Sequence, residues 1–292
     1  MNKERNICIV GLGLLGGSYA MGLTDAGYTV TAVDVRPEAI RYALEKGIIA
    51  AGAVEGFAPL LAGADAVVLG LYPHALVDWL RNNQKHLKPG ALLTDVCGVK
   101  SGVVEEIQGF LRPDAEFIAS HPMAGKETAG VANSEVDMYK NASYIITPTE
   151  LTDPEAQKTL EALARSIGFT RIEVTDPQRH DTIISYTSQL AHVVSSAYIK
   201  SPTSALTLGF TAGSFQDMTR VAKLDPDMWT SLFHMNKGPL LREINTLLHN
   251  LTVFRDALQE DDLSQVRGLL DQGRLLREEV LLRQHQNGTL DD

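Results

Sequence analysis

Cysteine, positive charge and long apolar runs are all scarce in this sequence of 292 residues. Its 2 cysteines, Cys8 in an apolar run and Cys97 in a turn, are too few for a disulfide framework or a zinc cluster. We therefore expect reduced thiols and no bound metal. The sequence has no apolar run of about 18 residues and no amino-terminal stretch in which a charged start precedes an apolar core. These absences predict a soluble, cytoplasmic protein without a membrane partner.

Basic residues are outnumbered by acidic ones. Lys and Arg total 26 and Asp and Glu total 36, which gives a net charge of −10. This balance speaks against general binding to nucleic acid or to an anionic membrane surface. An anionic substrate would have to be held by a local cluster of positive groups.

Strand-like and helix-like periods alternate over the first 175 or so residues. The strand-like runs lie at 6–10, 29–34, 65–71, 91–96, 116–120, 143–147 and 171–174, and the helical spacings at 37–46, 74–87, 101–111 and 153–166. Such alternation predicts parallel strands joined by right-handed helical crossovers, which is a doubly wound α/β sheet of the Rossmann type.

The strand signal stops after residue 181, and helical spacing follows at 182–199, 228–258 and 262–284. Gly238 and Pro239 interrupt the middle stretch. The length suits about two domains, so we predict a dinucleotide-binding domain over 1–175 and an all-α domain over 176–292.

A glycine motif directly follows the first strand and opens a helix; it consists of Gly11, Leu12, Gly13, Leu14, Leu15 and Gly16. A glycine-rich turn without a ligand is the alternative interpretation. In this context, however, the three glycines permit a tight turn, close approach of the backbone to a pyrophosphate, and close packing of the helix on the sheet. Asp34 ends the second strand 23 residues after Gly11, near the spacing at which an acid binds the adenosine ribose. Together these features predict a dinucleotide site.

The acid at the end of the second strand also bears on the choice of cofactor. A carboxylate at Asp34 repels a 2′-phosphate, which favours NAD over NADP. Arg36 could stack on adenine or pair with that phosphate, so NADP stays the less favoured alternative. Leu71, Tyr72 and Pro73, at the end of the third predicted strand, are assigned to the same cofactor site.

His121 directly follows the apolar run 116–120, at the carboxyl end of a predicted strand. In an open parallel sheet the substrate lies beyond these ends, beside the nicotinamide. A histidine there could merely cap the strand through a backbone hydrogen bond. Its place beside a predicted cofactor site favours a general base.

Four further segments carry a family resemblance: "SHPMAG" at 120–125, "HD" at 180–181, "SQLAHVV" at 188–194 and "SFQDMTRVA" at 214–222. Their order and approximate spacing resemble the prephenate/arogenate dehydrogenases of tyrosine biosynthesis, and the resemblance covers residues 6 to 285. It implies a Rossmann domain followed by a helical domain that binds substrate and forms the interface of a homodimer. It also implies NAD-dependent oxidative decarboxylation of prephenate to 4-hydroxyphenylpyruvate.

The resemblance assigns His121 as the base that acts on the ring hydroxyl of the substrate. Arg220 matches the arginine that binds the substrate, and its guanidinium fork suits a carboxylate; a surface ion pair with Asp217 is the alternative. His192 matches a histidine that contacts the substrate, and a satisfied core histidine is the alternative there. Ser188 lies four residues before His192, on the same predicted helical face.

Other parts of the resemblance are less specific. Glu127 matches a position at the pocket entrance and Lys126 lies beside it, although solvated loop charges look the same in a sequence. His180 and Asp181 are expected to cap the helix that they open and to pin the domain junction.

The chain departs from the family in two places. "DVCGVK" has Gly98 where the family often has a serine near the catalytic histidine, and Cys97, water or Ser101 are the candidates to replace that hydroxyl. Gln189 and Ala191 stand where the family commonly has histidine and proline.

Three alternative functions stay open at this point. Arogenate dehydrogenase differs only in an amino group on the side chain of its substrate. A β-hydroxyacid dehydrogenase would have a catalytic lysine in the helical domain, but Lys200, Lys223 and Lys237 fall in no motif. A dinucleotide-sensing regulator would not need His121, His192 and Arg220 together.

Overall fold

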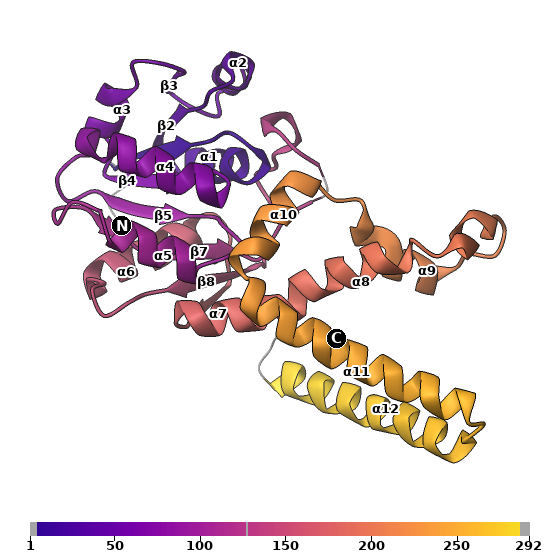
Figure 1. Ribbon diagram of the computed structural model, residues 1–292. Coiled ribbons are helices and arrows are strands. Elements are labelled where there is room, and N and C mark those ends of the chain that lie inside the picture. Colours follow the sequence, from indigo (N-terminus) through magenta and orange to yellow (C-terminus); the bar gives the residue numbers. More distant parts are fainter. Residues whose placement is uncertain (1–4, 127, 287–292) are drawn as a thin grey trace. The chain divides into compact units, whose positions relative to one another are not determined.

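The computed structural model describes residues 5–126 and 128–286 (Figure 1). Contacts within the chain define two compact units, Met1–Leu240 and Leu241–Asp292. The first unit extends beyond the domain boundary predicted near Asp176, which stays a prediction. All the candidate site residues lie in the first unit.

The first unit contains a parallel sheet of six strands in the order β3-β2-β1-β4-β5-β6. Its strands are β1 (Asn6–Val10), β2 (Thr29–Val33), β3 (Ala51–Ala53), β4 (Ala66–Leu69), β5 (Leu92–Asp95) and β6 (Glu116–Phe117). Crossovers run through α1 (Leu14–Asp25), α2 (Pro37–Glu45), α3 (Ala58–Ala62), α4 (Pro73–Asn83), the short η1 (Gln84–His86) and α5 (Ser101–Gln108). The order reverses between β1 and β4, which is where such sheets bind their ligands. The predicted Rossmann-type sheet is confirmed.

Two apolar clusters cover the two faces of this sheet. One joins α1, α2 and α6 (Pro154–Ser166) to the strands, and Tyr19 and Leu163 are among its buried members. The other joins α3, α4 and α5, and includes Leu76 and Ile107. Strands buried on both faces explain why the sequence shows nearly continuous apolar runs instead of strict alternation.

The last predicted strands form a second sheet, which corrects the expectation of one all-parallel sheet. Its order is β7 (Ala119–Pro122), β8 (Ser143–Thr147) and β9 (Arg171–Val174), and β7 pairs with β8 in antiparallel fashion. The Asp95 carboxylate, instead of a strand backbone, accepts the amide hydrogen of Ser120 at 2.9 Å. His121 therefore lies inside a strand, opposite Ile145, and not directly after one.

Helices follow the second sheet within the first unit, as the sequence predicts. They are α7 (Pro177–Ile184), α8 (Leu190–Tyr198), α9 (Gly213–Thr219) and α10 (Pro226–Met235), with short turns η4 (Pro202–Leu206) and η5 (Arg220–Ala222); a further short turn, η2 (Val131–Asn133), lies earlier, between β7 and β8. A π-helical turn, η3 (Ser185–Gln189), interrupts the single helix predicted at 182–199. Such turns are frequent at functional sites.

The second unit is a helical hairpin. It contains most of α11 (Lys237–Gln259) and all of α12 (Leu263–Gln286), which run antiparallel (Figure 1). Asp261 makes the turn with a positive φ of 54°. Gly238 and Pro239 lie in the first turn of α11, where proline is tolerated. No helix in the described ranges is long and apolar enough to cross a membrane.

Candidate active site

The glycine loop after β1 has no room for side chains at two positions. Gly11 has a φ of 92°, and a Cβ added there would lie 2.5 Å from the Gly70 carbonyl oxygen. A Cβ on Gly16 would lie 1.9 Å from the Gly11 carbonyl oxygen, so only glycine allows α1 to start this close to β1. At Gly13 a Cβ would meet nothing within 4 Å, which leaves the start of the helix open.

The amino end of α1 has the features of an anion site. Gly13 is its N-cap and supplies no side-chain cap, so the amides of Leu14, Leu15 and Gly16 have no side-chain acceptor there. The helix dipole adds partial positive charge at the same end. The structure thus fits a pyrophosphate at the predicted loop.

Asp34 lies at the end of β2, and its carboxylate is almost fully engaged. Oδ2 accepts the Leu12 amide hydrogen at 2.6 Å, and Oδ1 accepts that of Arg36 at 2.8 Å. The Arg36 guanidinium adds two hydrogen bonds of 3.1 Å, one to each oxygen. Burial opposes the charged form, but these hydrogen bonds outweigh it and lower the pKa of Asp34. The acid is held ionised at the place predicted for the ribose.

Leu71, Tyr72 and Pro73 connect β4 to α4 on the neighbouring side of the glycine loop. Pro73 begins α4, and Tyr72 is its N-cap with an exposed ring. Burial and the negative charge of Asp225 raise the pKa of Tyr72, and Arg36 acts in the opposite direction. The assignment of these three residues to the cofactor site stays a prediction.

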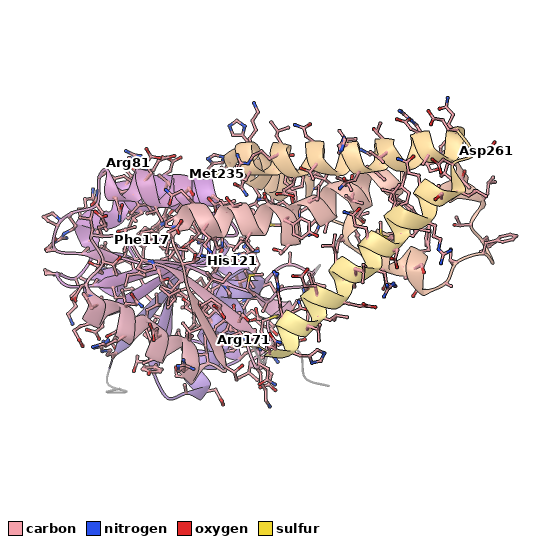
Figure 2. The ribbon with its side chains drawn as sticks, turned by 90° about the horizontal axis from the view of Figure 1, so that it is seen from below. Arg81, Phe117, His121, Arg171, Met235 and Asp261 are labelled. Carbon is pink, nitrogen blue, oxygen red and sulfur yellow. The ribbon has the colours of Figure 1, made fainter. Side chains whose placement is uncertain are left out.

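His121 is half-buried on β7 and is hydrogen-bonded to α7; Figure 2 labels it within the first unit. Its Nδ1 lies 3.0 Å from Nε2 of His180. Nδ1 of His180 in turn lies 2.8 Å from Oδ1 of Asp181. The same carboxylate accepts the amide hydrogens of Lys100 and Ser101, both at 2.8 Å, and so joins α7 to the start of α5.

A fully buried ion pair lies behind His121. Nζ of Lys100 donates to Oδ2 of Asp95 at 2.5 Å and to the Ser120 carbonyl at 2.6 Å, and both charged side chains are 0% exposed. Burial, followed by the neighbouring His180 and Lys100, lowers the pKa of His121 well below its ordinary value. His121 is therefore neutral at pH 7, as a general base must be.

His192 lies on α8 and belongs to a second group of side chains. Its Nδ1 lies 3.0 Å from the Val221 carbonyl, so this nitrogen carries the proton and donates it. The imidazole lies against Trp229 of α10, with ring centroids 3.6 Å apart and the ring planes tilted by 36°. Arg220, which precedes Val221 in η5, is exposed. The structure thus brings the segments that carry His192 and Arg220 together.

Helix α10 connects this second group to the Rossmann sheet. Leu232 is a buried member of the cluster that contains Leu76 and Ile107, and Trp229 packs against the same cluster. A Cβ on Gly98 would lie 3.8 Å from both Leu232 and the His121 ring. Helix α10 therefore contacts His192 through Trp229 and lies in the surroundings of His121 through Leu232.

Family models match most of the chain. The model for the prephenate dehydrogenase nucleotide-binding domain matches residues 20–173, and the model for the dimerization domain matches residues 176–272. The chain belongs to the prephenate dehydrogenase family. The predicted family and the predicted class, an NAD-dependent dehydrogenase of tyrosine biosynthesis, are confirmed.

Relatives and solved structures agree with this membership. Prephenate dehydrogenase of Bacillus subtilis is 27% identical over 97% of this chain and 78% of its own. The structure of Aquifex aeolicus prephenate dehydrogenase with hydroxyphenyl propionate and NAD+ aligns with a TM-score of 0.83, at 26% identity, over 94% of this chain and 98% of its own. Arogenate dehydrogenase of Synechocystis aligns with a TM-score of 0.80, at 27% identity, over 94% and 99%.

Lys126, Glu127 and Ser188 were predicted to contact the substrate. Lys126 pairs with Glu135 at 2.5 Å, and both side chains are about half exposed, so the structure shows a surface ion pair there. Glu127 lies outside the described residues. Ser188 is half-buried in the π-helical turn just before α8.

The two departures from the prephenate dehydrogenase family have structural consequences. Cys97 donates its thiol to the Leu71 carbonyl at 3.4 Å, and Ser101 is engaged with Asp181, so neither replaces the missing serine hydroxyl beside His121. Gln189 is buried and accepts a hydrogen bond from Asn236 at 2.8 Å, and the same amide group of Asn236 donates to the Asp181 carbonyl. Gln189 therefore helps to hold α7 against α10.

Four residues of this site were missed or undervalued in the sequence. His180 and Asp181 were interpreted as a cap, and only the "HD" match could have indicated more. Lys100 gave no signal, because its need for a partner follows from its burial, which the sequence does not show. Trp229 gave no signal, because its partner His192 is 37 residues away.

Proposed function

We propose that the chain oxidises prephenate with NAD and releases carbon dioxide, which yields 4-hydroxyphenylpyruvate. The observation that supports this most is His121, a neutral imidazole beside the end of β5 and held by a buried carboxylate through His180. NAD, when bound, accepts the hydride from the carbinol carbon of the ring. His121 takes the hydroxyl proton as the hydride leaves, which raises the hydride-donating power of that carbon and is worth about 10² to 10⁴ in rate.

The second half of the reaction needs no further oxidant. The bond between the ring and its carboxylate breaks, and its electron pair enters the ring and makes it aromatic. The oxygen that lost its proton to His121 recovers it and becomes the phenol hydroxyl. One prephenate and one NAD thus give one 4-hydroxyphenylpyruvate, one carbon dioxide and one NADH.

Arg220 and His192 are proposed to hold the substrate. Nδ1 of His192 donates to the Val221 carbonyl, which ties the imidazole to the turn that begins with Arg220. Arg220 begins the same short turn and supplies a planar fork that matches a carboxylate. This assignment depends on the family match, and the contact of His192 with Val221, the residue after Arg220, supports it.

A comparison of prephenate and arogenate, each with NAD and NADP, tests the proposed function. We expect the highest kcat/KM with prephenate and NAD. A higher kcat/KM with arogenate would make the chain an arogenate dehydrogenase, the activity named for the similar Synechocystis protein. Absence of turnover with both substrates would remove the proposal.

Cofactor preference is predicted to depend on Asp34 and Arg36 in opposite ways. Replacing Asp34 by Ala should lower the preference for NAD about tenfold, because charged hydrogen bonds of this kind are worth roughly 1.5 to 3 kcal/mol. Replacing Arg36 by Ala should raise that preference, because it removes one guanidinium hydrogen bond from each oxygen of Asp34 and removes the cation that could pair with a 2′-phosphate. Values of kcat/KM and fluorescence titrations with NADH and NADPH measure both changes.

The two variants act as controls for each other. General damage to the site would weaken both cofactors in both variants. A clear NADP preference in the parent protein would show that Arg36 dominates and that the interpretation of Asp34 is wrong.

We further propose a cytoplasmic homodimer. The matched dimerization domain supports it, and so do large apolar side chains that α11 and α12 expose in the single chain, such as Leu251, Leu258, Leu270 and Leu282. Sedimentation at micromolar concentration should give the mass of two chains. A single-chain mass throughout the concentration range would contradict the dimer.

A further inference from the structure

A line of three side chains leads from a buried carboxylate to the proposed base. His180 is 1% exposed and Asp181 is 4% exposed, so water does not compete for their hydrogen bonds. The two links measure 2.8 Å and 3.0 Å, which is the normal range for such bonds. Both residues lie on α7, whereas His121 lies on β7.

The carboxylate at the end of this line can only accept hydrogen bonds. Burial opposes its charge, but hydrogen bonds from His180 and Ser101 lower the pKa of Asp181, so it is ionised at pH 7. Oδ1 therefore accepts from Nδ1 of His180, and that nitrogen must carry a proton.

The ionised Asp181 carboxylate determines which ring nitrogen carries the proton in each of the two histidines. Burial, with the charge of Lys100, lowers the pKa of His180, and the imidazole is neutral. A neutral His180 with a proton on Nδ1 has an unprotonated Nε2, which accepts from Nδ1 of His121. Nε2 of His121 is then left with a free lone pair.

That lone pair lies where a substrate hydroxyl can reach it. A Cβ added to Gly98 would be 3.8 Å from Nε2 and Cε1 of His121. The unprotonated edge of the imidazole thus lies near Gly98, at the carboxyl end of β5, where ligands bind in such sheets.

We propose that His180 and Asp181 are positioning residues that fix His121 as the Nδ1-H tautomer and stabilise the imidazolium that forms when it takes the substrate proton. The proposal rests on the proposed function, in which His121 is the base. Positioning is needed because the other tautomer of His121 presents a proton to the substrate hydroxyl and cannot accept one.

The first test observes the tautomer directly and needs no turnover. Nitrogen-15 spectra of the imidazoles distinguish a protonated from an unprotonated ring nitrogen, and loss of one pair of signals in His121→Asn assigns that residue. We expect the parent protein at pH 7 to show His121 protonated at Nδ1 and unprotonated at Nε2. The opposite tautomer would overturn the proposal.

The second test uses one substitution to reverse the direction of both hydrogen bonds in this line of side chains. In Asp181→Asn the side-chain oxygen can still accept from an amide at the start of α5, while its NH₂ group donates to Nδ1 of His180. His180 then carries its proton on Nε2 and donates to Nδ1 of His121, which places the remaining proton of His121 on Nε2. We expect kcat to fall about 100-fold, with the KM for prephenate and the affinity for NADH within about threefold of the parent.

The matched control is Asp176→Asn. Asp176 is the exposed N-cap of the same helix and accepts the Arg179 amide hydrogen at 2.7 Å, and asparagine caps equally well. It should leave kcat and the His121 tautomer unchanged. A kcat for Asp181→Asn that matches this control would overturn the proposal.

A second variant covers the case in which Asp181→Asn does not fold. His180→Phe keeps a ring of similar size and removes both links, and we expect a kcat at least about 30-fold below the parent with NADH affinity retained. An unchanged kcat would again contradict the proposal. If the parent oxidises neither prephenate nor arogenate, the proposed function fails, while the spectra still decide whether the line of hydrogen bonds fixes the tautomer.

Discussion

Replacing His121 by Asn should lower kcat about 100-fold or more and leave the affinity for NAD nearly unchanged. Asparagine can still hydrogen-bond to His180, but it cannot take the proton of the substrate hydroxyl, and hydride loss then occurs without general-base assistance. NADH affinity should hold because no predicted cofactor contact involves this side chain. Steady-state kinetics and fluorescence titration measure the two quantities.

The control for this substitution is His86→Asn. His86 ends η1 and precedes the amino end of β5, whereas His121 lies beyond the carboxyl end of that strand. It should behave as the parent. A kcat for His121→Asn within a few-fold of the control would remove His121 from the mechanism.

The pH dependence adds a second readout for the same residue. The base acts when neutral, and the pKa of His121 is well below the ordinary value of about 6.5. Values of kcat/KM should therefore hold as the pH falls through 6.5 and decline only below it. The free energy of unfolding should begin to fall below pH 6.5, because the unfolded chain binds a proton there that the folded histidine does not. An acidic limb at or above pH 6.5 would contradict this environment for His121.

Arg220→Gln should raise the KM for prephenate roughly 30-fold or more, with a smaller change in kcat and none in the KM for NAD. The net charge of −10 repels a dianionic substrate at long range, so binding depends on close contacts such as a guanidinium fork. Truncating one partner of such a pair costs about 2 to 5 kcal/mol, and each 1.4 kcal/mol is a factor of about ten. Lysine at this position should recover only part of the loss, because it lacks the planar fork.

Arg165→Gln is the control for the loss of one positive charge. Arg165 lies near the end of α6 and donates to the Thr170 carbonyl at 3.4 Å, away from the predicted site residues. If Arg220→Gln keeps its KM for prephenate and only unfolds more easily, the arginine is structural. His192 would then be the first candidate for the carboxylate.

Strand periodicity and the glycine motif predicted the first sheet except for β3 (Ala51–Ala53), a short strand that is only partly buried. The need for glycine at Gly11 and Gly16 reflects contacts within the loop or with the end of the neighbouring strand β4. The second sheet could not be predicted in the same way. The antiparallel pairing of β7 with β8 joins residues more than 20 positions apart, such as Pro122 and Tyr144, and no local pattern near His121 encodes it.

The same distinction between local and distant contacts applies to the residues of the candidate site. Asp34 and the glycines follow the ends of β2 and β1, and His121 lies inside β7; all of them were proposed for the site from the sequence alone. The partners that determine their chemistry come from distant segments: His180 is 59 residues from His121, and Lys100 and Asp181 are 81 residues apart. Burial of Lys100 and the protonation of the two histidines depend on these contacts, and only coordinates show them.

The most direct test of the account is the stoichiometry of one reaction. Limiting prephenate, labelled with carbon-13 in its ring carboxylate, is incubated with the protein and excess NAD while NADH and labelled carbon dioxide are both measured. The account predicts one NADH and one labelled carbon dioxide for each prephenate consumed, with 4-hydroxyphenylpyruvate as the product. Formation of NADH without release of the label, or release of the label without NADH, would contradict it.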